Sequence, residues 1–290
     1  MADPADPRAA WASVPPPGTL PAVAALSELT TRVLAPNPSH ITLDGTNTYV
    51  IALAGSGAGL VVDPGPDDAS HRGRVEEVLA DRDLACDLVL VTHHHRDHTE
   101  AARAWGEHFG CPVAAPSPEG VGHGVRLVHD GDRLTVGGLV VEAVATPGHC
   151  ADHTAYRLPD GTVLSGDHIL GRGTSVVAWP EGDLAAYLES LRRVLDLGPD
   201  ALYPGHGPEM TDDPGAVITY YLEHRLFREE QILEALAAGI GRPGEMVRRI
   251  YAGFDPVLWV PAEWSTRAAL AKLVAEGRAA AEGDEFRLLP

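Results

Sequence analysis

Apolar positions fall in short runs through the first two thirds of the chain, and glycine, proline or aspartate bounds most of them. Short apolar runs between turn residues are typical of buried strands. The runs that predict strands are TNTYVIALAG, GLVVDPG, DLVLVTH, GGLVVEAVA, TAYRLPDGTVLSGD and ALYPGHG, with a further short strand at 112–115. Apolar residues at helical spacing lie between them at 71–83, 100–109 and 183–195. This alternation predicts an α/β layered sandwich with its chemistry on loops at one edge of the sheets.

The pattern changes after Pro208, where helical spacing replaces the short strands. A long amphipathic helix is predicted from Asp212 to about Gly239, and further helices at 244–254 and 265–280. A short strand is predicted at 284–290, so this part should form a small winged-helix-like region. Because residues 1–20 are rich in Ala, Pro and Asp, we expect a flexible segment there. The predicted parts are then 1–20, a catalytic domain at 21–211 and a C-terminal region at 212–290.

The charge of the chain is uneven. Its 290 residues are 44% apolar, as in a globular protein with a core, and carry a formal net charge of -19. From Tyr221 onward there are nine basic and eleven acidic side chains, so almost all of the excess negative charge precedes that residue. An acidic surface repels polyanions. The composition therefore disfavours a dedicated nucleic-acid-binding protein, although the C-terminal region would repel a polyanion least.

The sequence also indicates a cellular location. The three cysteines (Cys86, Cys111 and Cys150) form no CxxC pair, which suits a reducing interior. The first residues have neither the basic nor the apolar segment of a secretory signal, and no apolar run is long enough for a membrane span. We expect a cytoplasmic protein that is not attached to a membrane.

A histidine-rich segment, HHHRDH at 93–98, follows one of the predicted strands. Imidazole and carboxylate side chains are ligands of zinc-type ions, and positions two apart can present both side chains to one ion. His93 and His95 have this spacing, while Asp97 and His98 turn to a neighbouring position. His94 alternates away, and we expect it to line the site without binding a metal.

Three further candidates lie downstream, each after a strand and next to glycine. They are His149 in TPGH, Asp167 in SGD and His206 in YPGHG. The glycines permit the tight turns that aim such side chains and let the backbone approach an ion closely. Each residue alone could be an ordinary turn residue. Together with the histidine-rich segment they predict a metal centre.

The order HxHxDH, His, Asp, His resembles the metallo-β-lactamase superfamily over residues 30 to 210. This resemblance implies a four-layer αβ/βα sandwich and two Zn²⁺ ions, although Mn²⁺ or Fe suits the same ligands. By the resemblance, one metal would be held by His93, His95 and His149, the other by Asp97, His98 and His206, with Asp167 bridging them. Asp63 in VVDPG resembles the first motif of the superfamily, a carboxylate that orients the ligand loop.

A narrower resemblance is carried by DGTNTYVI, SGDHILGRGTSVV, YPGHGPEM and YLEHRLFREEQIL. These segments resemble the group named after β-lactamase-like protein 2, whose members also have a C-terminal winged-helix-like segment. The group includes endoribonucleases specific for single strands, and similar chains in polyketide pathways act as thioesterases. Glu100 departs from the small, glycine-rich residues expected after the histidine-rich segment.

The resemblance implies a dinuclear metal-dependent hydrolase that uses a metal-bridging hydroxide, with Asp97 as the proton carrier. The first hypothesis is an endoribonuclease-like phosphodiesterase on single-stranded RNA, in which Arg172, Arg225 or Arg228 meets phosphate. The alternative is a thioester or ester hydrolase of an acyl substrate, which the acidic surface favours. A third hypothesis is a non-catalytic, metal-stabilised scaffold. The oligomeric state stays open, a homodimer included.

Overall fold

Two mixed β-sheets form the centre of the protein. The structure is a computed structural model that describes residues 3–11 and 14–290. The strands of the first sheet lie in sequence order: β1 (Val23–Ala25), β2 (Thr30–Leu34), β3 (Asn47–Ile51), β4 (Ala58–Val62), β5 (Ala85–Leu90), β6 (Val113–Ala115) and β7 (Arg126–Leu127). The second sheet has the order β12-β11-β10-β9-β8, with β8 (Arg133–Val136), β9 (Leu139–Ala145), β10 (Thr154–Arg157), β11 (Thr162–Gly166) and β12 (Ala201–Pro204).

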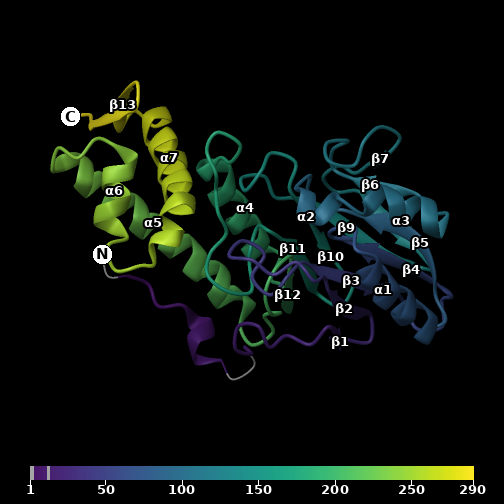
Figure 1. The fold of residues 1–290 in the computed structure, drawn as a ribbon. Helices are drawn as coiled ribbons and strands as arrows, with labels where there is room; N and C mark the ends of the chain where they lie inside the picture. Colours follow the sequence, from purple (N-terminus) through teal and green to yellow (C-terminus); the bar gives the residue numbers. More distant parts are fainter. Residues whose placement is uncertain (1–2, 12–13) are drawn as a thin grey trace.

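Helices cover the outer faces of both sheets (Figure 1). The first sheet packs against α1 (Ala69–Asp81) and α3 (Ala102–Phe109), and the second against α4 (Leu184–Asp196) and α5 (Pro214–Ala237). The short helix α2 (Arg96–Thr99) lies within the histidine-rich segment. This arrangement confirms the predicted four-layer αβ/βα sandwich. None of the described helices is both long and apolar enough to cross a membrane.

The central strands are buried on both faces. Tyr49 and Ile51 of β3 pack in the apolar core between the sheets, whereas Val50 of the same strand packs in the core that contains Trp105 of α3. Because both faces of such a strand need apolar side chains, the strand contains a short unbroken apolar run, which is YVI in β3. That property made β3, β4 and β5 predictable.

The C-terminal region contains α6 (Pro243–Ile250), α7 (Trp259–Ala275) and a hairpin of β13 (Ala279–Glu282) with β14 (Glu285–Leu288). The helix predicted at 265–280 begins earlier and ends earlier than expected. Gly277 has φ 70°, a left-handed conformation that turns the chain out of the helix and into β13. The region packs on α4 and α5 through apolar side chains such as Leu270 and Leu273. The limits 21–211 and 212–290 stay a prediction.

The N-terminal segment contacts the catalytic part of the molecule. Arg8 is buried and donates hydrogen bonds to the carbonyl oxygens of Leu170 and Gly173, both at 2.6 Å. Its guanidinium also pairs with Asp6 at 2.7 Å. These contacts hold the segment against the loop that follows β11.

Candidate metal centre

The seven predicted metal-binding residues come together where strands of both sheets end. The histidine-rich segment follows β5, His149 lies between β9 and β10, and Asp167 and His206 follow β11 and β12. Three groups each have their candidate ligand atoms within 4.8 Å of one another: His93, His95 and His149; Asp97, His98 and His206; and His93, His98 and Asp167. The structure thus brings together residues that lie more than one hundred positions apart in the sequence.

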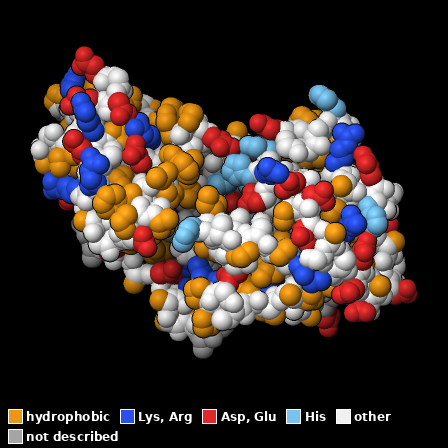
Figure 2. All heavy atoms as spheres, in the orientation of Figure 1, with side chains coloured by type: hydrophobic (Ala, Val, Ile, Leu, Met, Phe, Trp, Pro, Cys, Tyr) orange, Lys and Arg blue, Asp and Glu red, His pale blue; other side chains and the backbone are white. Residues whose placement is uncertain are grey.

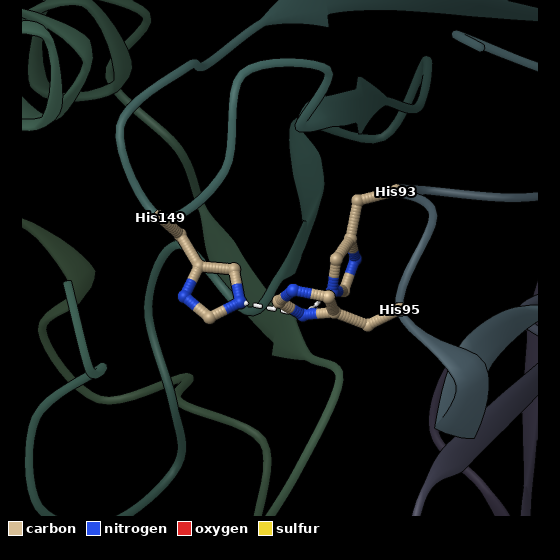
Figure 3. A group of neighbouring side chains, drawn as sticks. All are labelled: His93, His95 and His149. Carbon is tan, nitrogen blue, oxygen red and sulfur yellow. Dashed lines mark hydrogen bonds between the residues drawn. The ribbon is translucent and has the colours of Figure 1, made fainter. Parts of the chain in front are cut away.

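The first group consists of three imidazoles that point toward one another (Figure 3). His95 Nδ1 lies 3.0 Å from His93 Nε2 and 3.0 Å from His149 Nε2. The other nitrogen of each ring bonds to a group outside this trio. His93 Nδ1 bonds to Thr92 Oγ1, His95 Nε2 to Glu181 Oε1, and His149 Nδ1 to the Val176 carbonyl oxygen. A neutral imidazole that donates through one nitrogen presents a lone pair at the other. Three such lone pairs facing one point suit a bound cation.

The second group combines imidazole and carboxylate. Asp97 Oδ2 lies 3.1 Å from His206 Nε2, which lies 3.3 Å from His98 Nε2. Asp167 Oδ1 lies 3.4 Å from both of these nitrogens, and its Oδ2 is 3.8 Å from His149 of the first group. Asp167 Oδ1 is buried and makes no hydrogen bond with any described residue. A buried carboxylate oxygen without a donor, standing between two groups of imidazoles, fits a position shared by two cations.

The carboxylate of Asp63 fixes the histidine-rich segment through hydrogen bonds from Thr92 and His98. Its Oδ1 accepts a hydrogen bond from the Thr92 backbone at 2.8 Å, and its Oδ2 accepts from Thr92 Oγ1 at 2.8 Å. The same Oδ2 accepts from His98 Nδ1 at 2.9 Å. This last bond fixes the tautomer of His98, so that Nε2 faces the cluster without a proton when a metal binds. His206 Nδ1 is held in the same way by the Gly45 carbonyl oxygen, at 3.1 Å.

In the metal-free protein, the carboxylates and imidazoles of the cluster shift one another's pKa values. Burial lowers the pKa of His98, but the carboxylates of Asp63, Asp167 and Asp97 outweigh burial and raise that pKa well above its usual value. In the same way Asp167 outweighs burial at His206 and raises its pKa to about 9. Burial raises the pKa of Asp97, but the neighbouring His98 and His206 lower it to about 2. Protons on imidazole therefore balance the carboxylates in the metal-free protein.

Two glycines make the close packing possible. A Cβ atom on Gly205 would lie 2.5 Å from Asp167 Oδ1 and 2.7 Å from His98 Cε1, so a side chain there would enter the cluster. Gly148 has φ 133°, and a Cβ atom there would lie 2.4 Å from the Tyr187 backbone nitrogen of α4. These contacts explain why glycine precedes His206 and His149.

Hydrogen bonds join several neighbouring side chains to the cluster. Glu181 accepts from His95 across 86 positions of sequence, and it also lies 2.9 Å from His94 Nε2. His94 Nδ1 bonds to Asp152 Oδ1 at 2.7 Å. His153 Nε2 accepts from the Asp167 backbone nitrogen at 3.1 Å and thereby positions the start of that loop. A lone glutamate or aspartate in a loop looks like a solvated residue in the sequence, so only the fold reveals the contacts of Glu181 and Asp152.

The cluster and the sandwich agree with comparisons to known proteins. Residues 41–206 match the family described as "Metallo-beta-lactamase superfamily". The chain belongs to this superfamily. Membership confirms the predicted enzyme class, a hydrolase of that superfamily. Residues 243–287 match "Beta-lactamase associated winged helix domain", which confirms the predicted winged-helix-like region.

Individual relatives extend the similarity to most of the chain. A "Beta-lactamase-like protein 2 homolog" of Drosophila melanogaster is 34% identical over 283 residues, covering 89% of this chain and 92% of the relative. An "Atrochrysone carboxyl ACP thioesterase" of Aspergillus chevalieri is 36% identical over 219 residues, covering 75% of this chain and 68% of the relative. The crystal structure of a beta-lactamase domain protein from Burkholderia ambifaria has the same fold, with a TM-score of 0.77, 22% identity, and coverage of 93% and 95%.

Proposed function

We propose that this superfamily member is a two-metal hydrolase of acyl thioesters. The observation that carries the hydrolase assignment is the cluster of five imidazoles and two carboxylates, in which the buried Asp167 Oδ1 accepts no hydrogen bond from a described residue. One cation would bind His93, His95 and His149, the other would bind Asp97, His98 and His206, and Asp167 would contact both. This donor set suits Zn²⁺ first, and Mn²⁺ or Fe as well. When bound, two such cations would supply Lewis-acid polarisation of the attacked carbonyl and would lower the pKa of water toward neutrality.

The reaction would consume one water. Water adds to the thioester carbonyl carbon, the carbon–sulfur bond breaks, and a carboxylic acid and a thiol are released. Asp97 has the most exposed carboxylate of the cluster, at 27% against 9% for Asp167. We therefore assign to Asp97 Oδ2 the proton that the water gives up, which the departing thiolate then receives. Asp167 would stay a ligand.

Contacts of the arginines favour an acyl substrate over RNA. Arg172 pairs with Asp44 and with the Pro15 carbonyl oxygen. Arg225 is buried and donates to the Ser175 carbonyl oxygen, and Arg228 stacks on Tyr251 with 4.9 Å between guanidinium and ring centre. All three candidate phosphate-binding cations are thus engaged within the fold. A phosphodiesterase on RNA would need free cations beside its metals.

The relatives and the net charge also favour an acyl thioester over RNA as the substrate. One relative that covers three quarters of this chain is named as a thioesterase that acts on an acyl carrier protein. The net charge of -19 would repel an RNA strand, whereas it would not repel an uncharged acyl group.

A substrate panel tests the proposal. Metal-depleted protein is reloaded with Zn²⁺, Mn²⁺ or Fe²⁺ and offered acyl thioesters, with thiol release as the signal, and labelled single-stranded RNA. We expect thiol release from the loaded protein and its loss in Asp167→Ala, while RNA stays intact. Cleavage of RNA together with no release of thiol from any thioester would overturn the proposal in favour of the phosphodiesterase.

A further inference from the structure

Large apolar side chains are exposed on one face beside the metal cluster. Trp179 is 48% exposed, and Val260 and Trp264 of α7 are 57% and 40% exposed. Because residues four apart lie on one side of a helix, Val260 and Trp264 form a continuous strip. Figure 2 shows orange side chains gathered between the C-terminal helices and the pale blue histidines, at the edge of a hollow. Exposed apolar patches of this kind mark binding surfaces.

One loop joins this strip to the cluster. Val176, at its start, accepts a hydrogen bond from His149 Nδ1 at 2.7 Å, and Glu181, at its end, accepts from His95 Nε2 at 2.9 Å. Between them, the Trp179 backbone nitrogen donates to the Trp264 carbonyl oxygen at 3.4 Å. The loop is therefore bonded to two candidate metal ligands and to α7. Trp179 lies two residues from Glu181, whose carboxylate bonds to His95, so the strip begins beside the cluster.

The chemistry of the strip indicates what it binds. Its members are two indoles and an aliphatic side chain, and the charged residue nearest in sequence to Trp179 is the carboxylate of Glu181. On α7, Glu263 is paired with Arg267, which also pairs with Asp284. Sites for single-stranded nucleic acid combine aromatic stacking with a positively charged groove. The strip has the aromatic rings without unpaired cations, which fits an uncharged apolar occupant.

We propose that the strip formed by Trp179, Val260 and Trp264 binds the hydrocarbon chain of the acyl substrate while its carbonyl lies at the metal cluster. This proposal rests on the proposed thioesterase function and adds a substrate class to it, namely thioesters of extended apolar acyl groups. The C-terminal region would then contribute directly to the active site, through α7. Short acyl groups, which end before they reach the strip, would gain nothing from it.

Kinetics along a series of linear acyl thioesters, from acetyl to dodecanoyl, test the proposal. Once the chain reaches the strip, each added methylene should lower KM by about two- to fourfold. In Trp179→Ala the dependence of KM on chain length should largely disappear. The matched control is Val23→Ala, which removes an exposed apolar side chain from β1 and should behave as the parent.

A binding measurement separates the strip from catalysis. An S-dodecyl thioether analogue has no carbonyl to hydrolyse, and we expect Trp179→Ala to weaken its binding by about tenfold. Equal binding by parent and variant, or a KM independent of chain length, would overturn the proposal. Binding that depends on Trp179 without hydrolysis of any thioester would instead overturn the proposed function and keep the strip. A dimer that Trp179→Ala dissociates, or RNA bound through Trp179, would assign the strip to a different occupant and overturn the proposal.

Discussion

Replacing Asp63 by asparagine tests how the loop is held, because the side chain keeps its size and loses its charge. The buried carboxylate accepts three hydrogen bonds, two from Thr92 and one from His98 Nδ1. An amide oxygen can keep the bond from the Thr92 backbone, but the amide nitrogen would then face His98 Nδ1–H as a second donor. His98 would have to adopt the other tautomer, which places a proton on the Nε2 atom that faces His206 and Asp167.

The size of the effect follows from the bond that is lost. A hydrogen bond to a charged group contributes about 1.5–3 kcal/mol. Residues that orient a metal-binding imidazole typically change metal affinity by about 10- to 100-fold when they are replaced, which corresponds to about 1.4–2.7 kcal/mol. Both estimates agree, and we expect Asp63→Asn to weaken the site of Asp97, His98 and His206 by that factor. The site of His93, His95 and His149 should change less.

Competition with a chelator of known zinc affinity measures both binding steps, and circular dichroism establishes that the variant is folded. Asp130→Asn is the control, because Asp130 forms an exposed ion pair with Arg193 away from the cluster. We expect the zinc affinity of one binding step to fall in Asp63→Asn, and the affinities of both steps to stay unchanged in Asp130→Asn. A folded Asp63→Asn protein that binds both zinc ions as tightly as the parent would refute the reasoning about His98.

Three further predictions follow from the cluster and its surroundings. Asp97→Asn should lower kcat by about a hundredfold or more while the metal content per chain falls far less, and an equal loss of both would contradict its role as proton carrier. Because metal displaces the proton of His206, with its pKa of about 9, zinc affinity should rise with pH up to about 9, and calorimetry in two buffers should detect the released protons. Burial lowers the pKa of His71 from 6.5 to about 4, so its contribution to stability is complete above pH 6.5 and is lost as the pH falls toward 4, by at most about 3 kcal/mol. Urea unfolding of the metal-free His71→Gln protein should therefore depend less on pH over that range than unfolding of the parent, and an equally steep dependence would exclude this role.

The sequence predicted those parts of the fold that are buried on two faces or that carry ligands. The strand β4 is wholly apolar, and β3 and β5 end in the apolar runs YVI and LVL. The helix predicted at 183–195 is found as α4 at Leu184–Asp196. Edge strands such as β1 and β8 expose alternate residues and are short, so their sequences resemble loops. The helix predicted at 100–109 is found as α3 at Ala102–Phe109. The short helix α2, which carries Asp97 and His98, precedes it and was not predicted.

The clustering of the seven candidate residues was predictable because histidine and aspartate recur at fixed places relative to strands and glycines. The contacts around the cluster were not predictable, since Glu181 lies 86 positions from His95 in the sequence and the two meet only in the folded chain. The sequence also does not show whether an arginine is free to bind phosphate. As sequence positions, Arg172 and Arg225 are plausible phosphate ligands, but in the structure both are bonded to other parts of the chain.

The most direct test of a two-metal thioesterase is the rate of thioester hydrolysis measured against equivalents of metal added to the metal-free protein. The account predicts a rate that reaches its plateau at two metals per chain, together with two anomalous-scattering peaks, one beside His149 and one beside His206. It also predicts that Asp167→Ala loses both the second equivalent and the activity. Full activity with one metal or none, or an Asp167→Ala protein as active as the parent, would contradict it.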